Sequence, residues 1–195
     1  MHFVVCGLHM RGGPLTHQLT SVGGVFLRDA LSVPHYTLHV LSPVAPAVGP
    51  AKPGMLYHPP TSGGAATNTI TTAAAATTAT ATADDPATAT TAGPTTLTPA
   101  PGVGAIAVEV WDIPDVAIGG LLAGVPPPLA FGSVRLAAAA SPSGVEVLKG
   151  FVCEGWVARD GVADGVAFTD ITHHGGWRAY VASLEQGDGS SQGSD

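Results

Sequence analysis

The 195-residue sequence has few charged side chains and only two cysteines. Lys and Arg number seven and Asp and Glu fourteen, which gives a net charge of −7. The basic residues are scattered from Arg11 to Arg178 and form no basic patch, so the sequence does not favour nucleic-acid binding. The cysteines, Cys6 and Cys153, both lie in apolar runs, which is typical of free, buried thiols.

Metal-ligand spacing, a secretory signal and a long apolar run are also missing. No paired Cys/His spacing suggests a structural zinc site, and the adjacent His173 and His174 lack a third ligand at a usual distance. We therefore expect no metal ion and no other cofactor. Uncharged stretches occur, but Pro, Gly and Thr interrupt them, which argues against a membrane helix. No secretory signal precedes Arg11. The expectation is a cytoplasmic protein without membrane or nucleic-acid partners.

What is present is a glycine-framed stretch near the N-terminus, residues 4–15. A β-branched run reaches Cys6 and stops at Gly7, and two glycines followed by Pro14 then begin a new element. This pattern predicts a strand, a tight loop and a short helix over 14–22. Backbone N–H groups at the end of such a strand are free to meet an anion. We expect any active site to lie here.

His9 is the strongest candidate for chemistry, because imidazole titrates near neutrality and serves as an acid or a base without extreme tuning. Arg11 is placed either to hold a carboxylate or to remain a solvated surface charge. Gln18, one turn into the following helix, points back at the loop or into solvent. Glu109 and Glu154 lie on or beside strands, where they either orient His9, bind substrate or form surface salt bridges. The residues alone predict an anion-binding pocket with a titratable histidine.

The remaining pattern predicts an α+β domain in which strands outnumber helices. Hairpin spacing favours a mixed or antiparallel sheet, which we expect to form a small, closed or nearly closed β-barrel. The alternation of apolar residues predicts strands over 25–31, 36–41, 105–111, 131–136 and 145–153, and helices over 114–122 and 176–184.

Composition changes between residues 43 and 104. Proline is dense up to Pro60, and residues 61–98 are dominated by Thr and Ala, with no aromatic residue. Such a segment buries too little apolar surface to offset the entropy of ordering it. We therefore predict a disordered Thr/Ala-rich insert over 59–102, one domain split into 1–58 and 103–186, and a flexible tail over 187–195.

Eight segments in register resemble the C-terminal domain of allophanate hydrolase. The first is the Val-Cys-Gly-Leu-His-Met-Arg-Gly run, and a later one is Lys-Pro-Gly-Met. Together they cover almost the whole chain except the insert: residues 5–12, 14–19, 34–38, 52–55, 108–114, 125–129 with Gly132, 149–154, and 170–172 with 175–180.

The resemblance implies a fold similar to γ-glutamylcyclotransferases and a role in urea degradation. In the full-length family enzyme, an amidase-signature domain converts allophanate to N-carboxycarbamate, and the C-terminal domain is thought to promote loss of carbon dioxide from that dicarboxylate. His9 occupies the position of the family's proposed catalytic histidine. The implied substrate-binding residues are Gly7, Leu8, Met10, Arg11, Gln18, Tyr36, Glu154 and Arg178.

Two departures from the family limit this expectation. The chain begins almost at the first strand and contains no amidase domain, so we expect it not to hydrolyse allophanate alone. The segment 125–129 supplies no carboxylate where cyclotransferases need a glutamate, which disfavours cyclotransferase activity. The partners left open are an amidase-signature protein and a second copy of this chain. The alternative reading is a non-catalytic module that binds or dimerises with an amidase partner.

Overall fold

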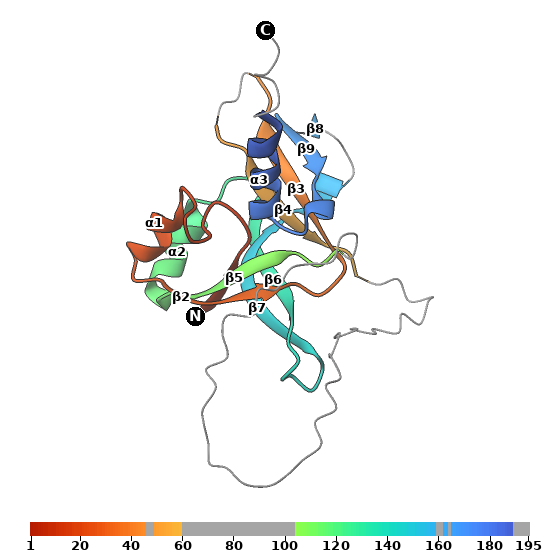
Figure 1. Ribbon diagram of the computed structural model, residues 1–195. Coiled ribbons are helices and arrows are strands. Elements are labelled where there is room, and N and C mark those ends of the chain that lie inside the picture. Colours follow the sequence, from red (N-terminus) through yellow and green to blue (C-terminus); the bar gives the residue numbers. More distant parts are fainter. Residues whose placement is uncertain (46–48, 60–103, 159–161, 164, 189–195) are drawn as a thin grey trace, which may run out of the picture. The chain divides into compact units, whose positions relative to one another are not determined.

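The computed structural model describes residues 1–45, 49–59, 104–158, 162–163 and 165–188 (Figure 1). Within these ranges the chain is mainly β-structure with short helices. The elements are β1 (His2–Val5), α1 (Thr16–Thr20), β2 (Val25–Leu31), β3 (Tyr36–Pro43), β4 (Lys52–Tyr57), β5 (Ala107–Asp112), α2 (Asp115–Ala123), β6 (Leu129–Ala137), β7 (Val145–Cys153), the 3-10 helix η1 (Gly155–Ala158), β8 (Val162–Ala163), β9 (Val166–Asp170), the 3-10 helix η2 (Thr172–His174) and α3 (Trp177–Asp188).

The strands form two sheets. The first is five-stranded with the order β2-β5-β1-β7-β6, and the second is four-stranded with the order β4-β3-β9-β8. In the first sheet, β1 runs antiparallel to β5 and parallel to β7, so the N-terminal strand is central and mixed in its pairing. A central position buries β1 on both sides and fixes where the loop after it begins. The predicted α+β class is confirmed.

The predicted closed barrel is not what the described strands form. The edge strands β2 and β6 meet through one isolated bridge, between Ser32 and Leu136, and the second sheet pairs separately. Closing a sheet requires continuous pairing of its two edges. In the described ranges that pairing is confined to one end, and the result is two sheets that share a core.

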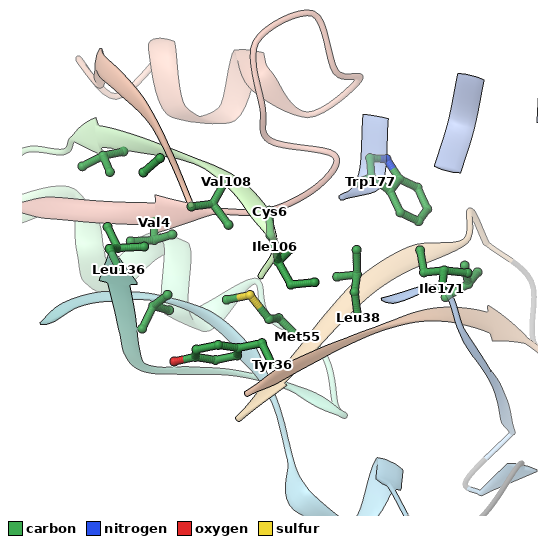
Figure 2. Packing of buried hydrophobic residues seen from close by; sticks show 14 residues of the cluster. Val4, Cys6, Tyr36, Leu38, Met55, Ile106, Val108, Leu136, Ile171 and Trp177 are labelled. Carbon is green, nitrogen blue, oxygen red and sulfur yellow. The ribbon is translucent and has the colours of Figure 1, made fainter. Parts of the chain in front are cut away.

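The main core lies between the two sheets and is closed by the C-terminal helix. Figure 2 shows Val4 and Cys6 from the β1 segment opposite Leu38 of β3 and Met55 of β4. Trp177 of α3, which runs beside the four-stranded sheet in Figure 1, joins the same cluster. Each fully buried side chain of this size contributes roughly 1.5–3 kcal/mol to folding. This packing holds the end of β1 in place.

A second cluster lies on the opposite face of β1. It contains Phe3, Val5 and Trp111, and Leu19 of α1 packs into it together with partly buried residues of α2. Met10 is also part of this cluster and is only 4 % exposed. The alternation along β1 thus sends side chains into both cores, and the loop after β1 is anchored by Met10.

The sequence patterns predicted no strand within the proline-dense part of the domain, but residues 52–57 form β4. This strand pairs antiparallel with β3, from Tyr36 opposite Tyr57 to Leu41 opposite Lys52. It occupies the edge of its sheet, where a proline is tolerated because one side of the strand donates no ladder hydrogen bond. The short strands β8 and β9 were also not predicted. The helix predicted over 14–22 is shorter and spans Thr16–Thr20.

The predicted insert over 59–102 falls outside the described residues, apart from Pro59. The tail predicted over 187–195 also lies outside them, except that α3 continues to Asp188. The helices in the described ranges are all too short or too polar to cross a membrane.

Candidate active site

The loop between β1 and α1 is a series of hydrogen-bonded turns. The N–H of Met10 donates to the Gly7 carbonyl at 2.8 Å, so Leu8 and His9 are the two central residues of a β-turn. A second turn follows, in which Gly13 N–H donates to the Met10 carbonyl at 2.8 Å. The predicted glycine-framed loop is therefore a compact structure with His9 at its first bend.

Gly7 sits where the loop meets β4, and this position accepts no side chain. A Cβ built on Gly7 would lie 1.8 Å from Cγ of Pro53. Because van der Waals contact begins near 3.5 Å, any other residue would push β4 away from the loop. The close approach brings Lys52, the neighbour of Pro53, to the same cavity as His9.

His9 is held from two directions. Its Nε2 lies 2.9 Å from the amide oxygen of Gln18 in α1, and its ring stacks on Phe151 of β7 with centroids 4.9 Å apart and planes inclined by 21°. An amide oxygen only accepts, so this hydrogen bond keeps a proton on Nε2 and makes Nδ1 the titrating nitrogen. Phe151 itself packs edge-on against Phe3 and Phe131, which fixes its ring.

Burial lowers the pKa of His9 below its usual value, and the nearby His17 acts in the same direction, while the Gln18 hydrogen bond opposes them. A depressed pKa makes the protonated imidazole a stronger acid than free histidine. Burial also raises the pKa of the Cys6 thiol, which lines the same cavity, to about 12. The thiol is therefore uncharged and does not act as a nucleophile.

A cavity of about 50 Å³ opens beside His9. Its wall is mostly apolar, and it contains one cationic side chain, Lys52, and no carboxylate among the described residues. The lining residues are Cys6, Gly7, Leu8, His9, Leu15, Lys52, Pro53, Leu129 and Phe151. A small apolar pocket with a titratable histidine and one ammonium group suits a small anion.

The structure places two of the predicted substrate-binding residues elsewhere. Arg11 and Arg178 both bind Glu109 of β5, which is fully buried. Arg11 donates to Glu109 from its main-chain N–H at 2.8 Å and from Nε at 2.9 Å, and Arg178 donates at 2.7 Å. Arg11 also pairs with Asp29 at 2.8 Å. Both guanidinium groups are thus engaged with carboxylates and do not line the His9 cavity.

Both carboxylate oxygens of Glu109 accept hydrogen bonds. Burial alone would raise the pKa of its carboxyl group, but the hydrogen bonds from Arg11, Arg178 and Trp111 outweigh burial and lower it. Trp111 Nε1 donates to Oε2 at 3.0 Å, and Arg178 donates a further bond of 2.7 Å to the Arg11 carbonyl. The sequence pattern left the role of Glu109 open. In the fold it ties the His9 loop to β5 and α3.

Three other predicted substrate-binding side chains also point away from the cavity. Met10 is buried in the second core cluster. Tyr36 is 1 % exposed, and its hydroxyl accepts a hydrogen bond of 2.9 Å from the N–H of Arg135. Glu154 is exposed and accepts a hydrogen bond from Trp156. Of the predicted site residues, Gly7, Leu8 and His9 line the cavity. Gln18 does not line it but binds the His9 ring.

Sequence reasoning missed Lys52, Pro53 and Phe151 as site residues. Lys52 and Pro53 belong to one of the motifs that carry the family resemblance, and Phe151 belongs to another, so a signal was present in the sequence. Their proximity to His9 depends on strand order, which a single sequence does not reveal. The described residues contain no group of three or more His, Cys, Asp or Glu side chains arranged to hold a metal ion.

Together, the fold and the site define a class: a small α+β domain that carries a histidine-bearing pocket at the end of its first strand. The sequence profile of the family described as "Allophanate hydrolase C-terminal domain" matches residues 1–69 and 62–182. The chain belongs to this family.

Two relatives are much longer than this chain. It is 27% identical over 184 residues to the urea amidolyase of Saccharomyces cerevisiae, an alignment that covers 93% of this chain and 7% of that protein. Among solved structures it resembles Kluyveromyces lactis allophanate hydrolase, with 26% identity, a TM-score of 0.57, and coverage of 94% of this chain and 21% of that one. The chain thus spans a small part of each.

A protein of about the same length as this chain has a similar fold. A uropathogenic E. coli-specific protein of known structure aligns with a TM-score of 0.55 and 20% identity, covering 93% of this chain and 94% of that one. At this identity the likeness concerns the fold alone. The fold therefore also occurs in a chain of about this size.

Proposed function

We propose that this chain promotes the loss of carbon dioxide from N-carboxycarbamate during urea degradation. The observation that carries the proposal is His9, a histidine held by Gln18 and Phe151 in a small cavity whose one cation is Lys52. The substrate is a small dianion, and a cavity to which the described residues contribute one ammonium group and no carboxylate is complementary to it.

Lys52 and the turn after β1 hold the carboxylates. Lys52 has no ionic partner among the described residues, so its charge is available to a ligand. In the turn closed by Met10 and Gly7, the N–H groups of Leu8 and His9 donate to no other described residue. Two adjacent free N–H groups form a concave site that suits a carboxylate. Lys52 takes the carboxylate-binding role that the sequence assigned to Arg11 and Arg178, because both of these guanidinium groups bind Glu109.

His9 supplies the proton that the reaction consumes. The C–N bond to one carboxylate breaks, carbon dioxide leaves, and the bonding electron pair remains on nitrogen. A proton from Nδ1 of His9 to this nitrogen gives the carbamate anion, which takes up a second proton from solvent and breaks down to ammonia and carbon dioxide. Because burial lowers the pKa of His9, its protonated form gives up the proton readily, and the bound dianion favours formation of that protonated form.

The intermediate itself has to come from another activity. Urea amidolyase and allophanate hydrolase, the relatives named above, are several times longer than this chain. We infer that an amidase-signature protein converts allophanate to N-carboxycarbamate and that this chain acts on the product.

A direct assay generates N-carboxycarbamate from allophanate with an amidase-signature protein and follows release of carbon dioxide in the presence and absence of this chain. We expect wild type to accelerate release and Lys52→Met to raise KM, with a smaller effect on kcat. Lys149→Met is the matched control, because Lys149 is exposed and binds Ser133 outside the cavity. A release rate unaffected by wild type would instead favour a non-catalytic module.

A further inference from the structure

A second compartment of about 60 Å³ adjoins the His9 cavity. Lys52 and Leu129 line both spaces, so the two are adjacent and share a wall. Prolines from two parts of the chain line the second compartment: Pro43 and Pro50, and the run Pro126, Pro127 and Pro128. Nothing in the proposed decarboxylation uses this space.

The chemistry of this compartment differs from that of the His9 cavity. Besides the prolines, its wall contains Leu41 and Val166, and Lys52 at the junction is its one charged side chain. Proline rings present only carbon and lack a backbone N–H, so these walls offer little to a polar group. Their fixed φ angles also keep the walls rigid, which lowers the entropic cost of binding.

We propose that this compartment is a subsite for a short apolar branch on a dicarboxylate whose carboxylates occupy the His9 cavity. The inference rests on the proposed function, because Lys52 orients the ligand in both spaces. In this proposal a carboxylate pairs with the Lys52 ammonium at the boundary of the two spaces, and a short substituent on the neighbouring atom reaches past Leu129 to the proline walls. The ligands that fill both spaces are therefore small dicarboxylates that carry a short alkyl group on the central atom, whereas N-carboxycarbamate occupies the His9 cavity alone.

The expected effect is large enough to measure. Each methylene that moves from water into an apolar wall contributes roughly a fourfold gain in affinity. A three-carbon branch that enters the compartment only in part still gives roughly a tenfold tighter dissociation constant. A branch left in solvent gives no gain, so a comparison of two ligands that differ in the branch alone reports on the compartment.

The test compares malonate with propylmalonate by isothermal titration calorimetry on the full chain at pH 7.5, where both ligands are dianions. We expect propylmalonate to bind about tenfold tighter than malonate. Val166→Phe fills the compartment and is expected to remove this advantage while leaving malonate affinity unchanged. Val147→Phe is the matched control, because Val147 is a strand valine that is 50 % exposed and lines neither space.

The outcomes separate this inference from the proposed function. Equal or weaker binding of propylmalonate, with malonate bound, overturns the subsite and leaves the His9 site standing. An advantage that persists in a folded Val166→Phe variant also overturns it, because the branch then binds elsewhere. If neither dianion binds, the dicarboxylate site and the subsite are both contradicted. The wild-type comparison stands even if Val166→Phe does not fold.

Discussion

The main chain and the side chain of Arg11 donate hydrogen bonds to the two different oxygens of Glu109, at 2.8 and 2.9 Å. Glu109 is fully buried in the central part of the five-stranded sheet, whereas the Arg11 side chain is 44% exposed. This pair fixes the far end of the His9 loop to β5. The relationship gives Arg11 a structural role in place of the substrate-binding role expected from its position next to His9.

Replacing Glu109 with Gln is expected to destabilise the fold by roughly 1–3 kcal/mol, because the hydrogen bonds to Arg11 and Arg178 lose their charge assistance. The cost stays below that of a fully buried broken pair, since both guanidinium groups remain partly hydrated. Urea unfolding measures the change. Asp29→Asn, which removes the 55% exposed partner of Arg11, is the control and should cost less than about 1 kcal/mol. Equal effects of the two variants would contradict the anchoring role of Glu109.

Replacing Gly7 with Ala is expected to cost roughly 1–3 kcal/mol, because the added methyl group overlaps Pro53 and forces β4 away from the loop. Gly119→Ala is the control. Gly119 lies in α2 with open space around it, and alanine there should stabilise the helix by roughly 0.5–1 kcal/mol. Thermal unfolding of both variants checks the prediction. A neutral Gly7→Ala would show that the loop does not press on Pro53.

His9 is expected to titrate below 6.5 in the free protein, because its burial lowers its pKa. A lower pKa in the folded than in the unfolded chain means that the unfolded chain binds protons first. The contribution of His9 to stability is therefore complete above pH 6.5 and is lost as the pH falls through the folded value.

NMR titration of the His9 ring measures this pKa directly, and saturating malonate is expected to raise it, because the dianion stabilises the imidazolium form. Wild type should also lose more stability than His9→Gln between pH 7.5 and 5.5. A His9 pKa that malonate leaves unchanged would argue against a dianion bound beside the ring.

The described residues that flank the predicted Thr/Ala-rich insert, His58 and Gly104, both bind the start of β3 or the residue before it. His58 N–H donates to the His35 carbonyl at 2.8 Å, and the next residue, Tyr36, donates to the Gly104 carbonyl at 3.2 Å. A short linker can therefore join the two parts of the split domain. We predict that replacing residues 60–101 with a short Gly/Ser linker leaves the midpoint of thermal unfolding within a few degrees of wild type. A large loss of stability would contradict the prediction of a disordered insert.

The sequence was informative where the signals are local. The strand, turn and helix around His9 follow from glycines and a proline within twelve residues, and the structure places His9 in that loop. The partner of Arg11 was not predictable, since Glu109 lies 98 residues further along the chain. The stacking of Phe151 on His9 depends on the parallel pairing of β1 with β7, which is a tertiary property.

The proline-dense region shows a second reason why part of the fold could not be predicted from the sequence. The sequence patterns predicted no strand at residues 52–57, yet this segment is the edge strand that carries Lys52 to the cavity. An edge strand tolerates proline, and only the partner strand reveals that the position is an edge. Barrel closure was overestimated for a similar reason, because hairpin spacing describes neighbouring strands and not the two edges of a sheet.

The measurement that tests the proposed role of His9 most directly is carbon dioxide release from freshly generated N-carboxycarbamate by wild type and His9→Asn. His2→Asn, at the exposed start of β1, is the matched control. We predict that His9→Asn lowers kcat by roughly a hundredfold or more, because the proton donor is lost, and that His2→Asn keeps the wild-type rate. Release by His9→Asn at the wild-type rate would contradict the assignment of His9 as the acid.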